Sequence, residues 1–284
     1  MRLILSFFCW AALTTAAVAN PISVHIPYSK TGNAQAVTRL ILDGLEQRGW
    51  RFDERVTANP QLSSETFKSA SQPMLLLWGT DLVPNRAHPA YRSAPTAADL
   101  LTITYVVPRY LCAVGNITAQ DYADRNRVLN VAVTAVPVDE QYLLALNQHL
   151  GTRHRFIKYT NSREVEAAVA AREVDAVMTS IGLRLQQQGR VQCLANTSQY
   201  RMGTVPLITD LHPHVTPKNF VAVSYFLVRG LPPADLARLR SDVVAVQKEY
   251  TPYTTYLERN QNPATPLVLG DQLHLITELD RNLP

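Results

Sequence analysis

The sequence predicts an α/β fold in which strands and helices alternate along almost the whole chain. Residues 22–26 alternate apolar and polar side chains, as a half-buried strand does, and apolar residues then recur at helical spacing from Ala34 to the stop at Gly49. Residues 74–78 form a continuous apolar run, which is typical of a strand covered on both faces. The same alternation restarts after Pro108, which indicates a second α/β unit on the same plan.

The remaining expected elements follow in order. We expect strands at 51–57, 100–107, 110–114, 129–133, 156–159, 174–178, 191–195 and 222–228. We expect helices at 64–71, at 139–151, after a cap at Ser162, from the segment 232–235 onward, and at 271–279. Residues 84–98 contain three prolines and no sustained period, which favours a surface loop.

Composition and net charge limit the classes of protein to which this chain can belong. The chain has 284 residues, of which 46% are hydrophobic and 18% charged, enough for a large core in one or two domains. Its 27 basic and 23 acidic residues give a net charge of +4 that is spread over the whole length. So weak and dispersed a balance does not favour nucleic acid as a partner.

The first 19 residues have the pattern of a secretory signal peptide. They carry one basic residue, Arg2, then an apolar run from Leu3 to Leu13, and they end in the small-x-small sequence Ala17-Val18-Ala19. The apolar run is too short for a membrane anchor. We expect cleavage near Ala19, export of the protein and a mature chain that begins near Asn20.

Two cysteines, Cys112 and Cys193, would remain after this cleavage. An even pair in an exported chain favours a disulfide, and two buried free thiols are the alternative. The pair lacks Cys-x-x-Cys spacing, so a metal site is not expected.

Motifs for catalysis are missing from the sequence. It contains no Gly-x-Ser-x-Gly elbow, no phosphate-binding glycine loop and no His-Glu-x-x-His pattern. The close pair His212 and His214 lies in a proline-containing turn without a third ligand nearby, which is weak evidence for a metal. We therefore expect a protein that is not an enzyme and has no cofactor.

The loop at 27–33 is the first candidate ligand site. Backbone N–H groups at the start of the following helix have no intrahelical partners, so the loop could cradle an anionic or polar group. The alternative is an ordinary first β-α unit without a ligand.

A series of short motifs extends along nearly the whole mature chain. They are the opening strand Pro21-Ile22-Ser23-Val24-His25-Ile26-Pro27, Asn59-Pro60, the stretch from Leu75 to Thr80, His88-Pro89-Ala90-Tyr91, Pro95, Asp99-Leu100, Ile103, Tyr159, Val174-Asp175, Val205-Pro206 and the helix start from Leu231 to Leu239. In order and spacing they resemble the Bug receptors, the TctC-like extracytoplasmic solute receptors of tripartite tricarboxylate transporters.

The resemblance implies a periplasmic location and a type II periplasmic binding protein fold with two lobes, each a mixed sheet flanked by helices. The ligand lies in the interlobe cleft, and there is no catalysis. Residues 20–108 and 222–284 would form the first lobe and residues 109–221 the second. In that family the ligand is usually a small organic acid, held by backbone N–H groups and hydroxyls. The implied partners are membrane transporter subunits, and we expect a monomer.

The family's loops map onto specific positions of this chain. We expect ligand contacts from Ser29, Thr31, Gly32, Asn33, Gly79, Thr80, Asp81, Thr134, Tyr159, Thr160 and Thr179, which lie at carboxyl ends of strands. The strands that contain Cys112 and Cys193 belong to one lobe near the crossover in the family, so the resemblance implies a Cys112–Cys193 disulfide.

The sequence also departs from the family. The first loop keeps a single glycine, and Thr179-Ser180 stands where a Phe-Asp pair is common. The loop before the helix at 139–151 is normally rich in glycine and serine, but here Thr134 is followed by Asp139 and Glu140. These acids could be exposed first-turn residues. Alternatively, the ligand has changed to a neutral, aromatic or cationic molecule, with Trp78 or Tyr28 as a stacking wall.

Three functions remain open. The leading one is capture of a small molecule for a tripartite tricarboxylate-type secondary transporter, with an organic acid as the leading candidate for the ligand. The second is an orphan binding protein with a changed ligand that feeds a sensor or another partner. The third, a periplasmic hydrolase or transferase, would require a nucleophile with a base in the cleft.

Overall fold

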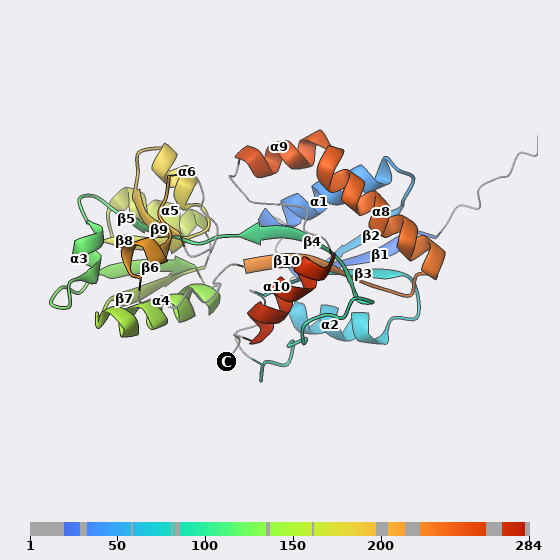
Figure 1. Cartoon of the computed structure of the whole chain (residues 1–284), viewed down its shortest axis with the longest axis horizontal. Coiled ribbons are helices and arrows are strands. Elements are labelled where there is room, and N and C mark those ends of the chain that lie inside the picture. Colours follow the sequence, from blue (N-terminus) through green and yellow to red (C-terminus); the bar gives the residue numbers. More distant parts are fainter. Residues whose placement is uncertain are drawn as a thin grey trace, which may run out of the picture.

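The chain folds into two mixed five-stranded sheets with helices packed on both faces of each. The computed structural model describes residues 20–28, 33–57, 59–80, 82, 86–134, 137–160, 162–196, 204–213, 222–259 and 269–281. The expected signal peptide lies outside these residues. The two sheets lie next to each other along the long axis of the molecule, with their strands pointing end to end (Figure 1).

The first sheet has the order β2-β1-β3-β10-β4. Its strands are β1 (Ile22–Ile26), β2 (Phe52–Val56), β3 (Met74–Gly79), β4 (Leu100–Val107) and β10 (Ala222–Arg229). β1 pairs in parallel with β2 and β3, whereas β10 runs antiparallel to β3 and β4. All six residues of β3 are buried, as its continuous apolar run predicts.

The second sheet repeats this arrangement. Its order is β7-β6-β8-β5-β9, with strands β5 (Tyr110–Ala113), β6 (Asn130–Thr134), β7 (Arg155–Tyr159), β8 (Ala176–Thr179) and β9 (Gln192–Asn196). β6 pairs in parallel with β7 and β8, and β5 runs antiparallel to β8 and β9. The predicted second α/β unit is therefore present.

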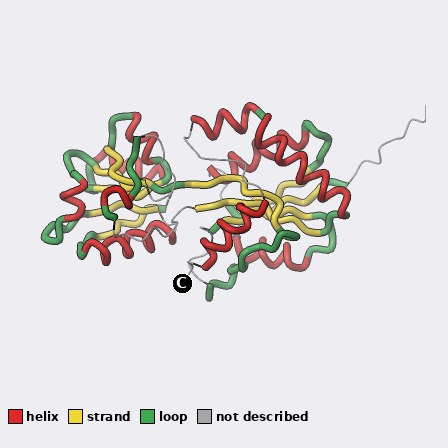
Figure 2. Tube along the Cα trace, viewed as in Figure 1, coloured by secondary structure: helices red, strands yellow, loops and turns green. Residues whose placement is uncertain are grey.

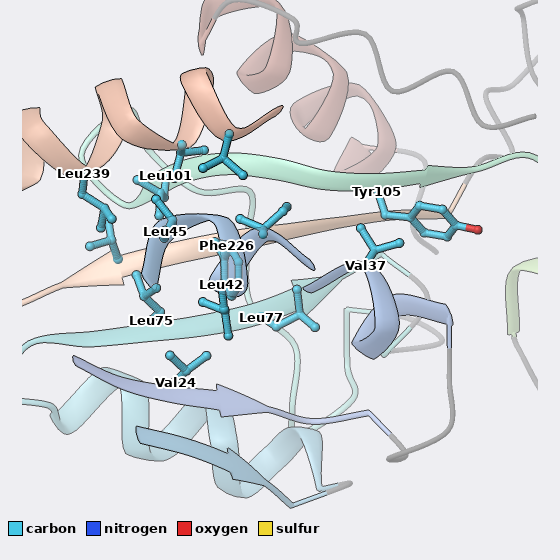
Figure 3. Close-up of a cluster of buried hydrophobic side chains, with 14 of the residues drawn as sticks. Val24, Val37, Leu42, Leu45, Leu75, Leu77, Leu101, Tyr105, Phe226 and Leu239 are labelled. Atoms are coloured by element: carbon cyan, nitrogen blue, oxygen red, sulfur yellow. The ribbon is translucent and has the colours of Figure 1, made fainter. Parts of the chain in front are cut away.

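Helices cover both faces of the first sheet. The helices α1 (Asn33–Glu46), α8 (Pro233–Glu249) and α9 (Thr251–Arg259) lie on one face, while α2 (Pro60–Ser69) and α10 (Leu269–Arg281) lie on the other. Figure 3 shows the first face, where Leu42 and Leu45 of α1 and Leu239 of α8 meet Leu75 and Phe226 of the strands. Burial of these side chains supplies the main stabilisation of this unit.

The second sheet is covered in the same way. The helices α5 (Ser162–Ala171) and α6 (Gly182–Gln187) pack on one face. The helices α3 (Ala119–Ala123), α4 (Pro137–Leu150) and α7 (Ile208–Leu211) pack on the other. Each sheet thus has a hydrophobic cluster on both sides.

The chain passes between the sheets where β4 runs into β5 through Pro108 and Arg109, and it returns in β10, whose Ala222 pairs with Val107 (Figure 2). β4 ends at this crossing, and β1, β2 and β3 point the same way. β5 begins at this crossing. β8 and β9 run antiparallel to β5 and therefore end there, and β6 and β7 end there too because they run in the same direction as β8. The carboxyl ends of these strands in each sheet therefore face the other sheet.

Helix boundaries differ from the prediction at several points. α2 begins at Pro60 instead of Ser64 because the Asn59 side chain accepts a hydrogen bond from the Leu62 N–H at 3.0 Å and caps an earlier turn. Ser162 is the first helical residue of α5, not a cap preceding it. α3, α6 and α7 were not predicted, since helices of 5, 6 and 4 residues are too short to show an apolar period. α9 was also missed.

The predicted disulfide is present. Cys112 of β5 and Cys193 of β9 lie directly opposite each other and are joined, which closes a sequence separation of 81 residues. Within the described ranges, no helix is long and apolar enough to cross a membrane. The same part of the chain contains no group of three or more His, Cys, Asp or Glu side chains placed to hold a metal ion.

Candidate functional site

Polar side chains form one row across the end of the second sheet that faces the first sheet. Thr134 of β6 is the register partner of Tyr159 of β7, and Tyr110 of β5 is the partner of both Thr179 and Asn196. Thr134 lies one step beyond the Val133–Met178 pair, which places it beside Thr179. Because register partners share one face of a sheet, these residues form a continuous second-sheet row: Tyr159, Thr134, Thr179, Tyr110 and Asn196.

The hydrogen bonds of this row are specific. The Thr134 hydroxyl donates to Asp139 Oδ2 at 2.7 Å, and the Thr179 hydroxyl accepts from the Ile181 N–H at 3.3 Å. The Asn196 amide donates to the Val205 carbonyl at 3.4 Å. Most of the row is thus fixed in orientation by its own lobe.

The two tyrosines at this end differ in environment. The Tyr110 phenol is buried and has no hydrogen-bond partner within the described part of the chain. Burial raises its pKa, and the nearby Tyr105 adds to the effect. Tyr159 is half-buried, and its pKa is raised by burial and by the charge of Glu173. Both phenols are therefore neutral and able to donate a hydrogen bond.

A buried ion pair lies next to the row. Arg109 Nε, in the crossing segment, is 2.8 Å from Asp139 Oδ1 in the first turn of α4, and the two side chains are 7% and 0% exposed. Of the two alternatives for the acids at this helix start, exposure in the first turn is therefore wrong for Asp139, which is buried and contacts Arg109 and Thr134. Glu140 is half-buried and pairs with Lys158 Nζ at 2.7 Å.

A second row crosses the end of the first sheet. Gly79 of β3 is the register partner of Ser224 of β10, and Ser224 is the partner of Tyr105 of β4. Tyr28 follows β1 and lies three steps beyond the His25–Leu76 pair, which aligns it with Gly79. The first-sheet row is therefore Tyr28, Gly79, Ser224 and Tyr105.

Two members of this row are in contact with each other. The Tyr28 hydroxyl lies 3.4 Å from Ser224 Oγ, the register partner of Gly79. The Tyr105 hydroxyl points along the strand, away from the other labelled side chains of the cluster (Figure 3). Beside the row, Thr80 closes the β3–β10 ladder, since its hydroxyl accepts from the Val223 N–H and its own N–H donates to the Val223 carbonyl, both at 3.0 Å.

Five of the predicted site residues lie at these two strand ends: Gly79, Thr80, Thr134, Tyr159 and Thr179. Thr160 is exposed one residue beyond the row, and its N–H donates to Glu164 Oε2 at 2.8 Å. Ser29, Thr31, Gly32 and Asp81 lie outside the described residues, as does the side chain of Asn33, which begins α1.

Trp78 corrects one interpretation of the sequence. It packs in the hydrophobic cluster under α2 and α10, on the opposite face of the sheet from the first-sheet row, so it does not form a stacking wall for a ligand at that row. Tyr110, Asn196, Ser224 and Tyr105 were missed by the sequence analysis. Tyr110 could have been marked, because it is the first strand residue after the Pro108-Arg109 break.

Comparisons with known proteins bear on the fold. No protein-family model and no curated protein matches the sequence. Several solved structures are similar. MatC from Rhodopseudomonas palustris, with bound malate, is 17% identical, with coverage of 92% of this chain and 98% of that one and a TM-score of 0.66.

Two further structures agree with it. The R. palustris protein Rpa4515, with adipate, is 16% identical, covers 92% of this chain and 94% of its own, and has a TM-score of 0.69. A TctC solute binding protein from Polaromonas is 15% identical, covers 93% and 98%, and has a TM-score of 0.66. The similarity extends over nearly the full length of each protein. The chain therefore has the two-lobed α/β fold of Bug- and TctC-type periplasmic binding proteins.

Proposed function

We propose that this protein is a periplasmic solute receptor that captures a small organic acid for a tripartite tricarboxylate-type secondary transporter. The observation that carries the proposal is the pair of polar rows at strand ends that face each other, the first-sheet row with Tyr28 and Ser224 and the second-sheet row with Thr134 and Tyr110. Small-molecule sites combine an apolar setting with a few convergent hydrogen-bonding groups. Relatives in fold hold malate and adipate.

The same proposal assigns the lobes and the ligand position. Residues 20–108 and 222–284 make the first lobe, residues 109–221 make the second, and the ligand lies in the cleft between them. The sheet memberships support this division, because β1 to β4 and β10 form one sheet and β5 to β9 the other. The crossings at Pro108 and at the start of β10 are then the hinge about which the lobes rotate.

The chemistry of the rows supports binding over catalysis. The Thr179 hydroxyl contacts a backbone N–H, and the Thr134 hydroxyl contacts a carboxylate that is itself paired with Arg109. A general base must be able to take the proton of the nucleophile, and an ion-paired carboxylate is a weaker base because the neighbouring charge stabilises its ionised form. The rows therefore offer contacts to a ligand without an activated nucleophile.

The direct test is to release and identify the small molecule that copurifies with exported protein. We expect a small organic acid in stoichiometric amount. After its removal, the acid should bind again, and Thr134→Val and Ser224→Ala should each weaken binding by about tenfold, since each removes a hydroxyl contact. Titration calorimetry measures the affinities.

A matched control is Thr66→Val on α2, whose hydroxyl donates to the Leu62 carbonyl at 2.8 Å, away from both rows. This variant should bind as the wild type does. The receptor function is contradicted if no small molecule copurifies and no organic acid binds. The assignment of the rows is contradicted if both row variants keep wild-type affinity.

A further inference from the structure

The direction of one hydrogen bond constrains the ligand. Asp139 is ion-paired with Arg109 and fully buried, so its carboxylate accepts hydrogen bonds and has no proton to donate. The bond of 2.7 Å between Thr134 Oγ1 and Asp139 Oδ2 must therefore use the Thr134 proton. What Thr134 can offer to a ligand is the remaining lone pair of its oxygen, which makes it an acceptor.

An acceptor at this point disfavours a carboxylate. A ligand oxygen in contact with Thr134 would lie about 5 Å from Asp139 Oδ2, two hydrogen-bond lengths away, and would meet a lone pair instead of a proton. Arg109 does not reverse this preference, because its charge already offsets that of Asp139. A hydroxyl or an amide N–H, in contrast, would complete the bonding of Thr134.

The neighbours of Thr134 fit the same ligand group. Thr179 has its oxygen occupied by the Ile181 N–H, so its proton remains to be donated, and the buried Tyr110 phenol can also donate. A primary amide or a hydroxyl both donates and accepts, so it matches an acceptor flanked by donors along one row. A carboxylate matches only the donors.

Resting on the proposed receptor function, we propose that Asp139 sets the specificity of the second lobe through Thr134. The ligand group that meets Thr134 is an uncharged hydrogen-bond donor, a hydroxyl or a primary amide. The ligand is then an organic acid that carries this donor besides its carboxylate. Malate, held by one relative in fold, has such a hydroxyl, whereas adipate, held by another, does not.

The test compares diacids with their monoamides. Succinate, glutarate and adipate are titrated into ligand-stripped mature protein beside succinamic, glutaramic and adipamic acids, so that chain length is covered. At the chain length that binds best, we expect the monoamide to bind at least tenfold more tightly than the diacid. A diacid that binds as tightly as its monoamide or more tightly overturns the inference and leaves the receptor function standing.

Variants connect the preference to the two side chains. Thr134→Val removes the acceptor and should abolish the preference for the monoamide, whereas Thr134→Ser keeps the hydroxyl and should retain it. Asp139→Asn should shift the ratio of affinities toward the diacid by at least tenfold. Glu140→Gln, a neutralised acid next in the same helical turn, should leave the ratio unchanged. A preference that survives Thr134→Val contradicts the mechanism, even if Asp139→Asn fails to fold.

The copurifying molecule gives an independent reading. An organic acid that carries a hydroxyl or amide group is the expected result, and an acid without such a donor would overturn the inference. If no compound of either series binds and no molecule copurifies, the proposed function itself fails.

Discussion

Arg109→Met is expected to lower the free energy of unfolding by about 3–5 kcal/mol, as removal of one partner of a buried ion pair does. The variant leaves the Asp139 carboxylate, which is 0% exposed, without the cation 2.8 Å away. Desolvation of an uncompensated charge is costly in so buried a position. Urea unfolding followed by circular dichroism measures the change.

Two further variants separate the ion pair from a general effect of losing an arginine. Arg109→Met combined with Asp139→Leu removes both charges and should recover most of the lost stability. Arg184→Met breaks a surface pair, since Arg184 contacts Glu166 with side chains 51% and 24% exposed, and it should cost less than about 1 kcal/mol. If Arg109→Met lowers the free energy of unfolding by no more than Arg184→Met does, the Arg109–Asp139 ion pair does not stabilise the contact between α4 and the segment at Pro108 and Arg109.

Replacement of Cys112 and Cys193 by serine is expected to destabilise the protein by roughly 4 kcal/mol in the chain-entropy model. The disulfide closes a separation of 81 residues, so its removal frees a long loop in the unfolded chain. In the folded state it ties the edge strand β9 to β5. The change in unfolding free energy between oxidised wild type and the double variant gives the measurement.

Reduction provides the control for this experiment. Dithiothreitol should bring the wild type to the stability of the double variant and should leave the stability of the double variant unchanged.

Gly182 of α6 packs directly on the disulfide, since a Cβ at this position would lie 2.7 Å from Cys112 Sγ and 3.1 Å from Cys193 Sγ. A loss below about 1 kcal/mol in the double variant would contradict a role for the bridge in stability.

Much of the fold could be predicted because its strands are read from short-range patterns. The buried strand β3 appears as an uninterrupted apolar run, and β10 appears as the apolar stretch that follows a proline-rich segment. The start of α2 was missed because a side-chain cap at Asn59 outweighed the apolar spacing. The shortest helices leave no period to detect.

The candidate site could be predicted only in part, for a geometric reason. Thr134, Tyr159 and Thr179 end strands whose carboxyl ends converge, so their position follows from the α/β pattern. Ser224 and Tyr110 are located by strand register, which no local pattern gives. The environment of Asp139 depends on Arg109, 30 positions earlier in the chain, and no local pattern predicts a contact between residues so far apart in the sequence.

The central claim is that a small molecule binds between the two lobes and draws them together. A ligand that contacts both lobes favours the closed form by its differential affinity for that form. Small-angle scattering of ligand-stripped protein, with and without the copurified molecule at saturation, tests this most directly. The account predicts a smaller radius of gyration with the molecule bound, and a radius of gyration that stays unchanged at saturation would contradict it.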